Sequence, residues 1–120
     1  PIAILINKNQ KFFLGRKYDL IEYKKIPKYN NLPTIFGDKE NFRSLLLNLK
    51  KINFPIDQIQ SYFLFGSNRW DIKMRNKKII KLPPQNYDFS LKNFLKINDK
   101  KNFEKYKIFD YRLNNQLILK

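Results

Sequence analysis

The chain of 120 residues has the length of one domain, and its 42% hydrophobic and 16% aromatic content is typical of a folded protein rather than a disordered one. It carries 25 Lys and Arg against 10 Asp and Glu, a formal net charge of +15, and it contains neither Cys nor His. These two absences exclude a disulfide framework, a thiol nucleophile, a zinc–thiolate site and a Ser-His-Asp triad, and the dispersed carboxylates do not suggest a metal cage.

Three short strands are predicted near the N-terminus, at residues 3–7, 11–14 and 18–23, because residues with turn chemistry separate them. The first strand begins almost at Pro1, so we expect a domain excised from a longer protein. No run approaches the ~18 apolar residues of a membrane-spanning helix. Residues 24–36, which include two prolines, are predicted to form a connecting loop.

A first helix is predicted from Asp38, whose side chain can accept a hydrogen bond from the first turn. Pro55 should end it. One face of this helix is apolar, since the following residues recur at helical spacing: Phe42, Leu45, Leu46, Leu49 and Ile52.

Strands follow at residues 58–65, 69–75 and 78–82. In the second of these Trp70, Ile72 and Met74 alternate with charged residues, which indicates a half-buried strand. We therefore expect Trp70 and Ile72 to pack against the apolar face of the first helix, at Leu45, Leu46 and Leu49.

A second helix should be capped by Asp88 or Ser90 and should end near Lys100. A hairpin is then predicted from strands at residues 106–113 and 116–119, joined at Asn114 and Asn115. This order of elements predicts a single α+β domain over residues 1–120, with an antiparallel or mixed β-sheet and both α-helices on one face.

The positive charge has more than one interpretation. A chain with a pI of about 10.0 can bind nucleic acid, but only five of its basic residues are Arg and no nucleic-acid-binding motif is present. Attraction to an anionic membrane is a second use of the same charge. The third interpretation is codon bias, because the abundant residues Lys, Asn, Ile, Phe and Tyr all have A/T-rich codons.

Several residues have both a functional and a structural interpretation. Arg69 and Trp70 are residue types that dominate binding hot spots, whereas the alternation favours Trp70 in the core and leaves Arg69 open. The aromatic residues with interspersed lysines are either a base-stacking platform or a core of biased composition. The last strand is either an edge that accepts a partner strand or an edge shielded by Lys120 or by further chain.

Four motifs, in order, resemble the C-terminal β domain of the bacterial cell-division family FtsQ (DivIB in Gram-positive bacteria). They are PIAI at residues 1–4, followed by FFL at 12–14 and Leu20-Ile21; LPTIFG at 32–37; RWDIKMRN at 69–76 with KLP at 81–83; and FDYRL at 109–113. The sequence is most similar to alphaproteobacterial members. It departs from the family pattern at Asn68, Lys77 and Tyr111, where the family has Arg, Gly and Leu.

The resemblance implies a non-enzymatic scaffold without a cofactor, on the periplasmic face of the inner membrane. Such proteins have a membrane helix and a POTRA domain before this β domain, so residues 1–7 would continue from a missing POTRA domain. They bind FtsB together with FtsL, and connect through them to the septal synthase FtsW–FtsI. In the family, FtsB adds a strand beside the last strand of the β domain.

Transferred to this sequence, the resemblance implies a partner site along the final hairpin. Its residues would be Arg112, Leu113, Gln116, Leu117, Ile118 and Leu119, with Arg69 as a second basic contact. Three other interpretations stay open. Arg112 could pair with Asp110 or Asp71 and only stabilise the sheet, the domain could bind nucleic acid, or Asp71 and Asp110 could meet on neighbouring strands as a hydrolase pair.

Overall fold

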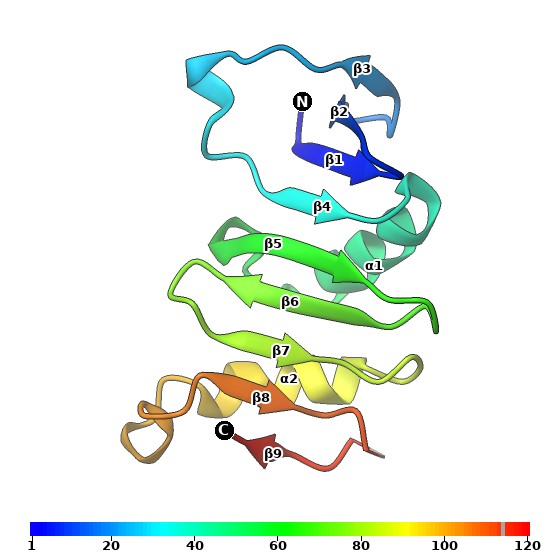
Figure 1. Ribbon diagram of the computed structural model, residues 1–120. Helices are drawn as coiled ribbons and strands as arrows, with labels where there is room; N and C mark the ends of the chain where they lie inside the picture. The colour runs from blue at the N-terminus through cyan, green and yellow to red at the C-terminus, as the bar shows by residue number, and fades with distance from the viewer. Residues whose placement is uncertain (114) are drawn as a thin grey trace.

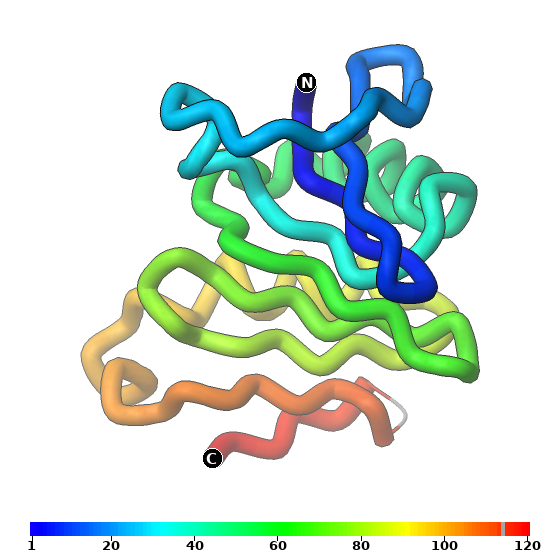
Figure 2. The backbone as a smooth tube through the Cα atoms, turned by 45° about the horizontal axis from the view of Figure 1, so that its top comes forward, coloured from blue at the N-terminus to red at the C-terminus, as the bar shows by residue number. Residues whose placement is uncertain are grey.

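The computed structural model describes residues 1–113 and 115–120. They form one sheet in the order β3-β2-β1-β4-β5-β6-β7-β8-β9, and α1 and α2 both lie behind it, on the same face (Figures 1 and 2). The predicted α+β class with two helices on one face is confirmed, and the sheet is mixed. The face that the helices leave free is called the open face below.

The N-terminal half of the sheet contains three adjacent parallel strands. The three predicted strands are present as β1 (Ala3–Asn7), β2 (Gln10–Leu14) and a β3 (Leu20–Glu22) that is shorter than predicted, and they form an antiparallel meander. β4 (Thr34–Phe36) then runs parallel to β1 and pairs with it, and β5 (Ile59–Leu64) runs parallel to β4 on its other side. The sequence did not predict β4, because three residues after a proline are too few to show a period. Only η1 (Pro27–Tyr29) and the loops around it follow the prediction for residues 24–36.

Helix α1 (Lys39–Lys51) begins as predicted and ends slightly differently. The Asp38 carboxylate accepts a hydrogen bond from the Asn41 backbone N–H at 2.8 Å. At the other end Asn53 adopts a φ of 58°, and the Phe54 N–H donates to the Leu49 carbonyl at 2.9 Å. This left-handed turn closes the helix before Pro55 is reached.

The short η2 (Ile56–Gln58) leads into β5. The C-terminal half of the sheet then contains, in chain order, β6 (Trp70–Met74), β7 (Ile79–Lys81), α2 (Asp88–Ile97), η3 (Lys101–Phe103), β8 (Ile108–Asp110) and β9 (Ile118–Leu119). β7 and β8 are parallel, and β9 returns antiparallel to β8.

Two details of this half differ from the prediction. Tyr87, and neither Asp88 nor Ser90, occupies the N-cap of α2, and it makes no side-chain hydrogen bond there. Asp88 is the first residue of the helix, and Ser90 lies buried inside it, where its hydroxyl donates to the Asn115 side chain. The last two strands are shorter than predicted. Asn114, part of the predicted turn, lies outside the described residues, and Asn115 has the expected positive φ of 60°.

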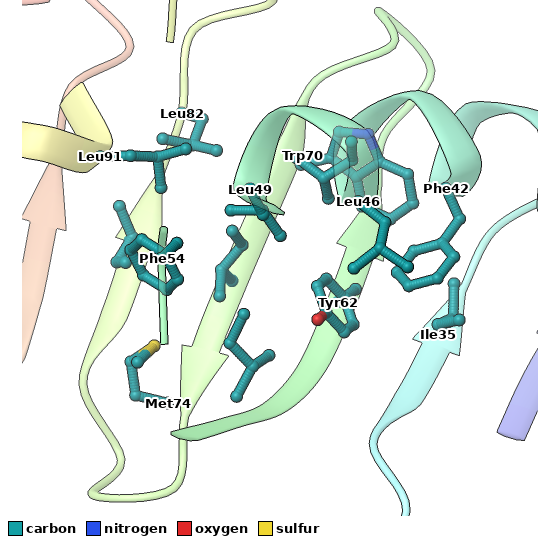
Figure 3. Close-up of a cluster of buried hydrophobic side chains, with 14 of the residues drawn as sticks. Ile35, Phe42, Leu46, Leu49, Phe54, Tyr62, Trp70, Met74, Leu82 and Leu91 are labelled. Atoms are coloured by element: carbon teal, nitrogen blue, oxygen red, sulfur yellow. The ribbon is translucent and has the colours of Figure 1, made fainter. Parts of the chain in front are cut away.

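The predicted core is confirmed. Trp70 is 4% exposed and Ile72 is fully buried, and both belong to one cluster with the apolar face of α1 (Figure 3). The Trp70 ring packs edge-on against Phe42 and Tyr62. Gly37 makes this packing possible, because a Cβ there would lie 2.8 Å from the Leu64 Cβ. The core therefore fixes how β4, β5 and β6 lie against α1.

Candidate functional site

The candidate site is the sheet edge formed by β9. This strand pairs with β8 on one side, through Phe109 opposite Leu119 and Asp110 opposite Ile118. The pairing extends to Lys120, whose N–H donates to the Ile108 carbonyl and whose carbonyl accepts from the Ile108 N–H, both at 3.1 Å. Within the described residues no strand lies on its other side, so this side presents backbone groups that can pair with another strand.

The side chains of this edge divide between the core and the surface. Leu117 and Leu119 pack against the core from the helix side of the sheet, and Ile118 points the other way with 42% of its surface exposed. Leu113 is 58% exposed, and Gln116 closes the turn by donating its N–H to the Leu113 carbonyl at 2.8 Å. The edge therefore presents two exposed apolar side chains to a docking strand, while its inner side chains hold it in place.

Arg112 stands beside this edge and is held by Asp110. Its Nε and Nη2 atoms donate to the two oxygens of Asp110, at 2.9 and 2.6 Å, and its backbone N–H donates to the same carboxylate at 3.0 Å. The Asp110 side chain is 5% exposed and that of Arg112 is 43% exposed. These hydrogen bonds lower the pKa of Asp110 and raise that of Arg112. The internal pairing with Asp110 thus exists, and it leaves part of the guanidinium facing solvent.

Arg69 lies on the same face but is less accessible. It forms an ion pair with Asp71 at 2.5 Å, donates more weakly to the Leu82 carbonyl at 3.4 Å, and covers the Phe65 ring at 4.5 Å. Only 13% of its side chain is exposed. Arg112 is therefore the more available cation for a partner.

Lys81 connects the two ion pairs, a position that the sequence analysis missed. The strand register places Asp71, Lys81 and Asp110 directly opposite one another on β6, β7 and β8. The charges on the open face thus alternate from Arg69 to Arg112, and we call these five residues the charge row. The strand pattern at residues 78–82 put Lys81 on the polar face, but only the register shows its neighbours.

This register also argues against a pair of catalytic carboxylates. Asp71 and Asp110 were expected on neighbouring strands, but β7 lies between them, and each carboxylate binds its own arginine. Among the described residues there is no group of three or more side chains suited to hold a metal ion. Nor does either α-helix of this part of the chain have the length and hydropathy to cross a bilayer.

Comparison with known proteins gives one family. A sequence model described as "Cell division protein FtsQ/DivIB, C-terminal" matches residues 4–112. Proteins named "Cell division protein FtsQ" from Rickettsia typhi and Rickettsia bellii are 28% and 30% identical to this chain over 99% of its length. The chain spans 46%, about half, of the length of each relative. The family match ends at Arg112, whereas the alignments with the relatives also cover the segment that contains β9.

Proposed function

The chain belongs to the FtsQ/DivIB family of cell-division proteins, whose C-terminal domain it matches, and on this premise we propose that it is a non-enzymatic interaction domain of the divisome. Its partner is FtsB, together with FtsL, and it acts on the periplasmic face of the inner membrane. Through these partners it connects indirectly to FtsW and FtsI, the septal peptidoglycan synthase.

The observation that carries this proposal is the exposed β9 edge with Arg112 beside it. An added FtsB strand would form backbone hydrogen bonds along residues 116–120, which set its register. Leu113 and Ile118 would contact the apolar side chains of the FtsB strand. Leu117 and Leu119 anchor β9 to the core on the helix side of the sheet. The solvent-facing part of the Arg112 guanidinium would bind an FtsB carboxylate, with Arg69 as a more distant contact, and a desolvated pair of this kind contributes a few kcal/mol.

Binding of an FtsB peptide to two variants tests the proposal. Arg112→Glu reverses the charge beside the edge, and truncation after Asn115 removes β9. Both should weaken binding by at least about tenfold, since about 1.4 kcal/mol corresponds to that factor. Arg16→Glu, an equal charge reversal in the exposed β2–β3 turn, is the matched control and should bind like the parent. If both site variants fold by circular dichroism and bind like the parent, β9 is not the docking edge.

The charge keeps nucleic-acid binding as a second candidate, although three of the five arginines already bind other groups of the domain. Arg69 and Arg112 are paired with aspartates, and Arg75 donates to the backbone carbonyls of Asp57 and Asn31. Phosphate contacts therefore depend largely on lysines. Tight binding to generic DNA that falls steeply with added salt, together with no response to FtsB, would favour this candidate.

A further inference from the structure

A second exposed surface lies on the open face of the N-terminal half of the sheet, away from β9. Four apolar side chains form it, and we call them the aromatic strip: Ile6, Phe36, Phe63 and Phe65. The register places Ile6 beside Phe36 and Phe36 beside Phe63. The two Phe rings stack with centroids 4.9 Å apart and planes 3° apart. Phe36 is 38% exposed and Phe65 is 44% exposed.

The strands beneath this strip form the parallel part of the mixed sheet, since β1, β4 and β5 are adjacent and run in one direction. Sheets made only of parallel strands occur almost only with both faces buried, so an uncovered face over three parallel strands is notable. Here α1 and α2 cover one face, and within the described residues no helix lies over the aromatic strip (Figures 1 and 2). Contiguous apolar side chains left exposed in this way mark interaction sites.

The charges around the aromatic strip indicate the kind of partner. Lys11 is the cross-strand neighbour of Ile6. On β6, Asp71 lies opposite Phe63, and Lys73 lies opposite Ser61, diagonal to Phe63. Neither lysine is in an ion pair with a described residue. The nearest carboxylate in the register, Asp71, is bound by Arg69. The strip is therefore flanked by positive charge on both sides. A second copy of a chain of +15 would add repulsion here.

We propose that the aromatic strip binds an acidic segment of a protein partner. Apolar side chains of that segment pack on Phe36 and Phe65, and its carboxylates face Lys11 and Lys73. These lysines are four strand spacings apart, about 19 Å, which an extended segment of about six residues spans. The site shares no residue with the β9 edge and does not depend on the proposed function.

An NMR titration of the 120-residue chain tests this. The probe is a seven-residue peptide in which aspartates alternate with phenylalanine or leucine. We expect amide shifts in β1, β4 and β5. The double variant Lys11→Glu, Lys73→Glu should bind at least about fivefold more weakly, because it reverses both flanking charges. Phe36→Ser should do the same, whereas Phe89→Ser, which removes a still more exposed Phe from α2, should have no effect.

Four results would overturn the proposal. The first is that the same peptide with lysines in place of aspartates binds equally well, and the second is that the shifts appear only in β9 or the helices. The third is that the peptide does not bind while Phe36→Ser reduces co-sedimentation with phosphatidylglycerol vesicles, which would identify a lipid contact. The fourth is that Phe36→Ser abolishes a dimer seen by ultracentrifugation, which would identify a second copy as the occupant. Should Phe36→Ser fail to fold, the lysine double variant gives the same decision, because both side chains lie at the surface. FtsB binding is read separately through Arg112.

Discussion

On the open face of the sheet, the C-terminal half carries the charge row, whereas the N-terminal half carries the aromatic strip. In the charge row the two arginines bind the two aspartates, and Lys81 lies between the aspartates. In the aromatic strip, Phe rings stack on one another and the flanking lysines lack acidic partners among the described residues. In the C-terminal half, the charges bind one another, and only at the β9 edge is one of them, Arg112, partly exposed. In the N-terminal half, both apolar surface and positive charge are left for a partner.

The largest expected loss of stability tests whether the two halves depend on one hydrophobic core. Trp70 lies on β6, between the halves, and is buried against α1. Trp70→Ala should lower the free energy of unfolding by ~3–5 kcal/mol, because the removed ring leaves a cavity. Urea denaturation measures this, and Leu47→Ala, at an exposed position of α1, is the control. A loss below about 1 kcal/mol would show that the halves do not depend on this core.

A smaller loss is expected from the charge row alone. Asp110→Asn removes the negative charge and one of the two acceptor oxygens that Arg112 binds. It should lower the free energy of unfolding by about 1–2 kcal/mol at neutral pH, since one partner is half exposed. The exposed Asp99→Asn is the matched control.

The same substitution predicts a pH dependence. Hydrogen bonding from Arg112 lowers the pKa of Asp110 in the folded state. The ion pair therefore contributes its full stability above the unfolded value of about 4 and loses it as the pH falls further. The difference in unfolding free energy between the parent and Asp110→Asn should shrink below about pH 4. A difference that stays constant down to pH 2 would contradict the ion pair.

Lys81→Met should lower the free energy of unfolding by a still smaller amount. Lys81 separates two carboxylates, and its charge contributes to the lowered pKa of Asp110. We expect a loss of about 0.5–1 kcal/mol that diminishes in high salt, because the lysine is only partly buried. Lys92→Met, at an exposed position of α2, is the control. Equal effects of the two substitutions would show that the charge row has no special arrangement.

The smallest effect concerns the lysine excess as a whole. It should produce weak adsorption to anionic vesicles at low salt, on the order of 1 kcal/mol for each lysine near the surface. Because this attraction is spread over the surface, Phe36→Ser should not change it. Equal sedimentation with anionic and neutral vesicles would leave codon bias as the explanation of the charge.

The elements with a clear period were predictable from the sequence. The spacing of Phe42, Leu45 and Leu49 gave α1, Asp38 gave its start, and the alternation around Trp70 gave β6 and its buried face. β4 was not predicted, because three residues between parallel neighbours are too few to show an alternation. The N-cap of α2 was not predicted either, because Tyr87 caps the helix without a side-chain hydrogen bond.

The candidate site was only partly predictable. Alternation placed Arg112 on the face opposite Phe109 and Tyr111, and the family resemblance drew attention to the last strand. That Arg112 binds Asp110, and that Lys81 lies between Asp71 and Asp110, depends on the register of three strands, which a single sequence does not contain. The aromatic strip was missed for the same reason, since its members come from β1, β4, β5 and the following turn.

Amide hydrogen exchange of the chain, with and without an FtsB peptide, tests the docking edge most directly. Strand addition forms new backbone hydrogen bonds on the outer side of β9, so exchange should slow at residues 116–120 and little elsewhere. The Arg112→Glu variant should require about tenfold more peptide for the same protection. Protection confined to β3, to the helices or to the aromatic strip, with β9 exchanging as in the free chain, would contradict docking at this edge.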